Sequence, residues 1–303
     1  MEKIILRLFI ILLIIEILLR LTGAIYYFLH TYMPFKNDND KIRILCLGDS
    51  VTFGLGAKKG EDYPTQLYNL LEYKYPGKFL VYNRGVPGMT SSQLLLNLKR
   101  FIKETKPSLV ILLSGVNEYC PRVNTLNTFI ILESRLPLFN NLVFNLSYLL
   151  CNLRIYKLAV LLIDNFKYKI IEYYGSYIAN KPGYDFLCNP FSSKQTLSLL
   201  TRQYKFNIDK ITQFVRNEGS EVIYITYLTP VMYEEIKDAA YRNRAILCDQ
   251  VEMLKKEDIT LSTLLTEDGF HPNSKGYQLM AKFLFKIIEE SKSELKLPVH
   301  IFN

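Results

Sequence analysis

From Ile42 to near the C-terminus, short apolar runs of strand length alternate with segments of helical periodicity. The expected strands lead from Ile42 to Ser50 and cover 79–83, 109–113, 222–227 and, more weakly, 259–261. Apolar residues recur at helical spacing in 63–73, 94–102, 200–215, 231–256 and 280–288. This alternation is typical of an α/β fold with a parallel sheet. A hydrophobic content of 49% in 303 residues is enough to bury a sizeable core.

Residues 119–200 break the alternation. The stretch is rich in Leu, Phe and Tyr and is punctuated by Pro137, Pro182 and Pro190. We expect a helical insertion that packs against the core, in preference to a lid over a substrate site. Charged residues such as Arg154 argue against a membrane span within it.

The N-terminal stretch has a different character. Residues 4–29 are almost continuously apolar and long enough to span a bilayer as a helix. Glu16 and Arg20 lie four positions apart, so pairing would lower the cost of burying their charges. Positive residues near the N-terminus, including Arg7, favour a cytoplasmic N-terminus with the rest of the chain outside the cytoplasm. The prediction is one N-terminal transmembrane helix that anchors the protein, with a cleaved signal peptide and an interfacial helix as alternatives.

These observations predict four parts along the chain. A membrane anchor over 1–30 and a polar linker over 31–41 precede the main domain. The domain covers 42–290, with the insertion at about 119–200, and a tail covers 291–303.

The net charge and the numbers of cysteines and histidines argue against nucleic-acid binding and against a metal site. A net charge of +8 is spread along the chain, which suggests contact with anionic membrane or polysaccharide surfaces, but no dense basic run indicates nucleic acid. Five cysteines without CxxC spacing argue against zinc, and free buried thiols are favoured over a Cys151–Cys188 disulfide. With three histidines in all, a poly-histidine metal site is nearly excluded. No metal or organic cofactor is expected.

The predicted strand ends carry the residues of one chemical reaction. A serine hydroxyl such as Ser50 needs a base within hydrogen-bond reach and a third group to hold that base. His271 is the plausible base within the domain, and Asp268 lies close enough in sequence to hold its ring. Acyl transfer also needs donors at the developing oxyanion, which Gly88, Asn117 and the Ser50 N–H could supply. Open parallel sheets bind ligands at the carboxyl ends of their strands.

Each of these residues also has a structural interpretation when taken alone. Gly-Asp-Ser is most often a turn that caps a helix, and Gly88 could serve only the turn after Pro87. Asn117 could be a strand-end turn or a helix cap, and His271 could be a surface residue after an Asp-Gly turn. Their joint placement at strand ends favours a common site.

The chain resembles the SGNH/GDSL hydrolases. Four motifs carry the resemblance in order: Gly48-Asp49-Ser50, Asn83 to Gly88, Gly115-Val116-Asn117-Glu118, and Asp268-Gly269-Phe270-His271-Pro272. The resemblance implies a three-layer α/β/α sandwich with a flavodoxin-like parallel sheet of about five strands. It also implies Ser50 as nucleophile, Gly88 and Asn117 as oxyanion donors, His271 as base and Asp268 as its partner. Glu118 and Met89 depart from the common pattern, in which both positions are Asp.

We therefore expect a membrane-anchored serine esterase that acts on an acyl ester, either a lipid or an acylated glycan. One alternative is an O-acyltransferase that uses the same residues to acetylate a cell-surface polysaccharide. A second is a non-catalytic, membrane-tethered binding module. The sequence does not specify the acyl chain, the alcohol or the oligomeric state.

Overall fold

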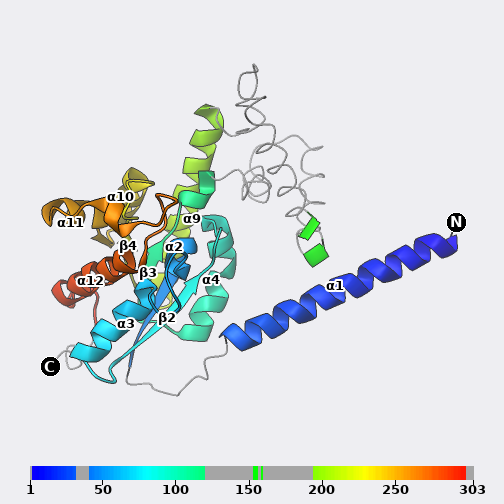
Figure 1. The fold of residues 1–303 in the computed structure, drawn as a ribbon, viewed down its shortest axis with the longest axis horizontal. Helices are drawn as coiled ribbons and strands as arrows, with labels where there is room; N and C mark the ends of the chain where they lie inside the picture. Colours follow the sequence, from blue (N-terminus) through cyan, green and yellow to red (C-terminus); the bar gives the residue numbers. More distant parts are fainter. Residues whose placement is uncertain (1, 32–40, 120–152, 156–157, 160–193, 298–303) are drawn as a thin grey trace. The chain divides into compact units, whose positions relative to one another are not determined.

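The computed structural model describes residues 2–31, 41–119, 153–155, 158–159 and 194–297 (Figure 1). The chain divides into two compact units. One comprises 1–38 and 125–193, and the other comprises 39–124 and 194–303. The predicted linker lies almost wholly outside the described residues, as does most of the predicted insertion.

The larger unit is built on a parallel sheet. Five strands lie in the order β2-β1-β3-β4-β5, which is the flavodoxin-like order. Their bounds are β1 Ile42–Gly48, β2 Phe79–Gly85, β3 Leu109–Leu113, β4 Glu221–Ile225 and β5 Ile246–Cys248. Every neighbouring pair is parallel, with Cys46 opposite both Asn83 and Ile111. The predicted α/β fold and its strand number are confirmed.

Helices cover the sheet in pairs, which makes the fold a three-layer α/β/α sandwich (Figure 1). Helix α3 packs against α12, and α4 packs against α9. The helices are α3 Tyr63–Lys74, α4 Ser91–Thr105, α9 Lys194–Asn217, α10 Tyr233–Arg242, α11 Gln250–Lys256 and α12 Ser274–Glu290. All residues of β3 are buried, as expected for a strand covered on both faces.

The fifth strand is not where the sequence pattern placed it. We predicted a strand at 259–261 and a continuous helix over 231–256. Instead α10 ends at Arg242, and Arg244 adopts a left-handed conformation with φ 47°. The chain then turns into the three-residue strand β5. Three apolar residues are too few to distinguish the two-residue period of a strand from the 3.6-residue period of a helix, so the sequence pattern assigns the run to the neighbouring helix.

The N-terminal helix exists as predicted, as α1 Glu2–Thr31. The further prediction that it crosses a membrane is not supported, because no helix among the described residues is long and apolar enough to do so. Arg7, Glu16 and Arg20 interrupt its apolar run. The predicted Glu16–Arg20 pair is present at 2.7 Å.

Glu16 has a second role within its own unit. Its carboxylate oxygens accept hydrogen bonds from the backbone N–H groups of Arg154 at 3.0 Å and Ile155 at 2.9 Å. Both donors begin a helical stretch, where N–H groups lack intrahelical partners. The Glu16 carboxylate, a charged group in an apolar helix, therefore binds the start of another segment of the same unit.

Candidate active site

The turn after β1 presents the predicted nucleophile. Asp49 caps the short helix α2 Ser50–Phe53, accepting a hydrogen bond from the Val51 N–H at 2.9 Å. Ser50 is the first residue of α2, so its own N–H has no partner within the helix. A side chain on Gly48 would collide with the Leu113 carbonyl oxygen, which explains the glycine at the end of β1.

The structure brings the Ser50 hydroxyl, His271 and Asp268 into one hydrogen-bonded chain. Ser50 Oγ lies 2.9 Å from His271 Nε2. On the other side of the ring, His271 Nδ1 lies 2.5 Å from Asp268 Oδ2. Ser50 and His271 are 221 positions apart in sequence, so the fold itself creates this contact.

Asp268 is held as an ionised group. Partial burial raises its pKa, but this effect is outweighed by hydrogen bonds from the His271 ring, the Phe270 and His271 N–H groups and the Thr266 hydroxyl. The pKa of Asp268 therefore lies well below its usual range. A carboxylate that can only accept leaves the proton on His271 Nδ1, so Nε2 faces Ser50 as an acceptor.

A tight loop between the 3-10 turn η3 Leu261–Leu264 and α12 fixes the imidazole. The Thr266 N–H donates to the His271 carbonyl at 2.8 Å, and Leu265 bridges Pro272 across the loop. The Phe270 ring packs edge-on against the His271 ring, with centroids 4.9 Å apart. The His271 ring is therefore held in place by its own loop.

Gly88 lies in a turn after β2. The Met89 N–H donates to the Val86 carbonyl at 3.0 Å, Pro87 takes the second position, and Gly88 adopts φ 75° at the third. This is the pattern of a type II turn, whose third position strongly favours glycine. The turn hydrogen bond does not use the Gly88 N–H.

Asn117 lies just beyond β3, in the 3-10 turn η1 Val116–Tyr119. Its side-chain amide donates to the Met89 carbonyl at 3.1 Å. An amide nitrogen has two hydrogens, so one remains for another acceptor. The structure therefore places the Asn117 amide beside the turn that contains Gly88.

Glu118, which departs from the common family pattern, is buried and holds the start of α4. Its carboxylate accepts a hydrogen bond from the Ser91 N–H at 2.5 Å. Burial raises the pKa of Glu118 to about 7, against the opposing effect of the Ser91 hydrogen bonds. The second acid of the motif therefore joins two site loops without reaching the Ser50–His271 pair.

Sequence reasoning missed one residue of this region, Tyr227. It follows β4, is buried, and donates a hydrogen bond from its hydroxyl to the Asp49 carboxylate. The available signal was its place at a strand end on the carboxyl edge, where ligand sites form. The Tyr227 hydroxyl is a single polar group in an apolar run, which by itself does not indicate a functional residue.

Of the five cysteines, Cys46 and Cys248 are free and buried, as predicted. Cys120, Cys151 and Cys188 lie outside the described residues. Within the described part of the chain, no group of three or more His, Cys, Asp or Glu side chains is arranged to hold a metal ion.

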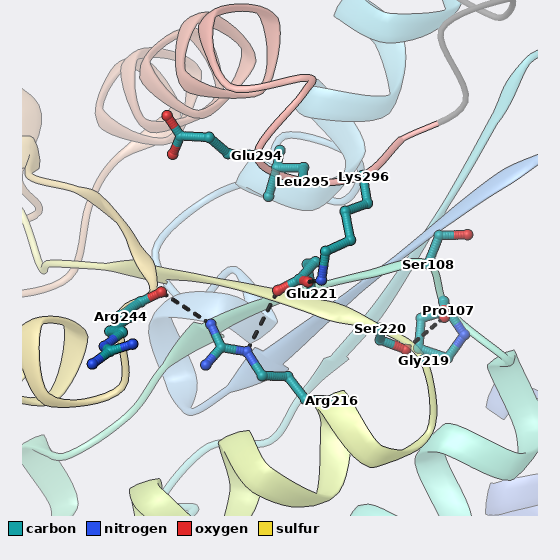
Figure 2. A pocket seen from close by; sticks show the side chains of 10 residues that line it. All are labelled: Pro107, Ser108, Arg216, Gly219, Ser220, Glu221, Arg244, Glu294, Leu295 and Lys296. Carbon is teal, nitrogen blue, oxygen red and sulfur yellow. Dashed lines mark hydrogen bonds and ion pairs between the residues drawn. The ribbon is translucent and has the colours of Figure 1, made fainter.

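A cavity of about 790 Å³ lies away from these residues, at the amino-terminal ends of β3 and β4 (Figure 2). Its charged side chains are partly paired: Arg216 and Lys296 both contact Glu221. None of the predicted site residues lines it. Ligands of open parallel sheets bind at the opposite edge, where the predicted site residues lie.

Comparison with protein families decides the assignment. A model of the GDSL-like lipase/acylhydrolase family matches residues 44–284. The chain belongs to this family. As a GDSL-like acylhydrolase it is an ester-bond hydrolase, and the matched segment includes Ser50, Gly88, Asn117, Asp268 and His271.

Solved structures share the fold of this GDSL-like protein. One is described as a GDSL-like lipase from Parabacteroides merdae, with a TM-score of 0.50 and 13% identity over 82% of this chain and 96% of that one. Another is an acetylxylan esterase from Geobacillus stearothermophilus, with a TM-score of 0.50 and 15% identity over 82% and 94%. At these identities the similarity concerns the fold alone. Comparison with curated proteins gave no match.

Proposed function

We propose that the protein is a serine esterase in which Ser50, His271 and Asp268 act as a catalytic triad. The observation that carries the proposal is the continuous chain from Ser50 Oγ through both His271 nitrogens to Asp268, at 2.9 and 2.5 Å. A serine hydroxyl is a weak nucleophile without a base at this distance. The ionised Asp268 fixes the ring tautomer that the base needs.

The first half of the reaction forms an acyl-enzyme. His271 Nε2 takes the proton from the Ser50 hydroxyl as Oγ attacks the ester carbonyl carbon. The tetrahedral intermediate collapses, and the imidazolium returns the proton to the leaving alcohol as the ester C–O bond breaks. In the second half His271 activates water by the same proton transfer, and the acyl group leaves as a carboxylic acid.

Three donors would hold the negative oxygen of each tetrahedral intermediate. They are the N–H groups of Ser50 and Gly88 and the side-chain amide of Asn117. The helix-start position of Ser50, the turn at Gly88 and the remaining Asn117 hydrogen support this assignment. Such donors are already in position before the charge develops, and they bind the charged oxygen of the transition state more strongly than the neutral carbonyl of the substrate.

Replacing Asn117 by alanine tests the oxyanion assignment. We expect kcat for p-nitrophenyl acetate to fall by roughly 10²- to 10³-fold with little change in KM, since the lost donor serves the transition state. Asn97→Ala is the matched control, because Asn97 also donates its amide to a backbone carbonyl, that of Gln93 at 2.8 Å. If Asn117→Ala has the same kcat and KM as Asn97→Ala, Asn117 is not part of the oxyanion hole.

Product analysis tests hydrolysis against acyl transfer. The enzyme is incubated with p-nitrophenyl acetate, with and without an oligosaccharide acceptor, and the products are identified by mass spectrometry. A hydrolase releases acetate whether or not the sugar is present. Acetylated oligosaccharide as the main product would support the O-acyltransferase instead.

A further inference from the structure

A second carboxylate of the site has no part in the triad. Asp49 immediately precedes Ser50 and is completely buried, with 0% exposure. One of its oxygens accepts from the Val51 N–H at 2.9 Å and the other accepts from the Tyr227 hydroxyl. A buried carboxylate is costly unless its surroundings use the charge. A neutral side chain such as asparagine could cap α2 equally well.

Tyr227 ties this carboxylate to the other parts of the site. Its hydroxyl donates to Asp49 and accepts from the Val116 N–H at 3.3 Å, next to Asn117. Its ring lies 5.8 Å from the Phe270 ring, which packs against His271. One buried side chain thus contacts the segments that carry the nucleophile, the oxyanion amide and the base.

We propose that Asp49 and Tyr227 form a positioning pair, in which Tyr227 keeps Asp49 ionised and the Asp49 charge stabilises the His271 imidazolium during acyl transfer. The inference rests on the proposed triad, since it concerns the charge that forms on His271 when Ser50 loses its proton. Neither side chain touches the reacting atoms. Both act through His271.

The charges around Asp49 support this role. Among the described residues, the titratable groups that interact with Asp49 include His271 and three tyrosines: Tyr63 of α3, Tyr227 after β4 and Tyr277 of α12. Burial raises the pKa of each tyrosine above its usual value, so all three are neutral near pH 7. The Asp49 carboxylate and an imidazolium at His271 therefore attract each other without a competing charge from these rings.

The Tyr227 hydrogen bond controls how much Asp49 is charged. Burial raises the pKa of Asp49 to about 6, while the hydrogen bond from Tyr227, and the positive charge of His271 when its ring is protonated, lower it. We expect removal of the Tyr227 hydroxyl to raise this pKa further, so that a larger fraction of Asp49 is neutral near pH 7. At high pH Asp49 ionises again, even without its donor.

The test compares pH profiles of kcat/KM for p-nitrophenyl acetate between pH 5 and 9.5. Asp49→Asn keeps the shape of the side chain and removes its charge. We expect kcat/KM to fall about tenfold, and the acid limb to move to lower pH by about one unit, because the imidazolium loses its stabilising partner. The main effect is expected in kcat, with KM little changed.

Tyr227→Phe gives a second and sharper signature. Its activity deficit is expected to be large at pH 6.5 and to shrink towards pH 9 as Asp49 ionises, and the double variant should be no worse than Asp49→Asn. Tyr204→Phe is the matched control: Tyr204 is equally buried and donates to the Ser114 carbonyl at 3.1 Å. Its acid limb should stay where the wild-type limb is.

The inference fails if Asp49→Asn lowers activity equally at every pH, or if the Tyr227→Phe deficit is constant with pH. Either result would assign the pair a purely structural role. If Asp49→Asn does not fold, the Tyr227→Phe profile alone decides. The two proposals can fail separately. If Ser50→Ala is inactive but the acid limbs of Asp49→Asn and Tyr227→Phe match that of the wild type, this inference is overturned and the proposed esterase stands. An active Ser50→Ala variant overturns the triad itself.

Discussion

Replacing Ser50 by alanine is expected to lower kcat/KM for p-nitrophenyl acetate by roughly 10⁴- to 10⁶-fold. The hydroxyl that attacks the carbonyl is lost, so no acyl-enzyme can form. The residual rate comes from water attack assisted by the oxyanion donors and by binding. Initial rates followed by p-nitrophenolate release, at substrate concentrations from well below to well above KM, give both kinetic constants.

Ser50 is buried at 7% exposure, so its substitution needs a folding check. The loss of one oxygen from the first turn of α2 should leave the circular dichroism spectrum and the midpoint of thermal unfolding nearly unchanged. Ser293→Ala serves as the matched control, because Ser293 lies on the surface near the C-terminal end. A folded Ser50→Ala variant that kept more than about a tenth of wild-type activity would contradict the nucleophile assignment, given the losses seen when triads are broken.

Replacing His271 by alanine is expected to lower kcat/KM by a similar factor, about 10⁴- to 10⁶-fold. Without the base at 2.9 Å, the Ser50 hydroxyl keeps its proton near neutral pH. Because the two residues act as one unit, the Ser50→Ala/His271→Ala double variant should be no slower than either single variant. Additive losses in the double variant would contradict a shared step.

Added imidazole distinguishes a missing base from a damaged fold. His271 is partly exposed, with 18% of its side-chain surface accessible, so a small base can reach its place from solvent. We expect imidazole to restore part of the activity of His271→Ala and none of the activity of Ser50→Ala. His300→Ala, which removes one of the other two histidines of the sequence, should behave as wild type.

Four of the five strands, and the meeting of Ser50, His271 and Asp268, could be predicted from the sequence for a common physical reason. Strands buried on both faces are continuous apolar runs, and their carboxyl ends are marked by turn residues such as Gly48 and Gly88. Parallel strands gather these ends at one edge of the sheet. Residues far apart in the chain, such as Ser50 and His271, are therefore expected to lie close together.

Other features depend on interactions that periodicity does not record. Strand β5 has only three residues and follows a left-handed turn at Arg244. Its short apolar run therefore could not be distinguished from the helical pattern of the flanking residues. Tyr227 belongs to the site through one hydroxyl on an otherwise apolar residue. Glu16 binds the backbone N–H groups of residues 154 and 155, a contact with no signature in either stretch.

The N-terminal region gave the least reliable prediction. Its length and apolar content indicated a transmembrane helix, and we expected pairing of Glu16 with Arg20 to lower the cost of the charges within it. The helix is present, but no described helix can cross a membrane. The location of the domain outside the cytoplasm stays a prediction from the charges near the N-terminus.

Covalent labelling with a fluorophosphonate, which reacts with a serine activated by a neighbouring base, tests the role of Ser50 directly. The labelled protein is digested, and the modified peptide is sequenced by mass spectrometry. We expect a single adduct on Ser50 and a loss of esterase activity in proportion to labelling. We also expect no adduct in Ser50→Ala and very slow labelling in His271→Ala. Full esterase activity of a fully labelled Ser50 enzyme, or an adduct on another serine that tracks the loss of activity, would show that Ser50 is not the nucleophile.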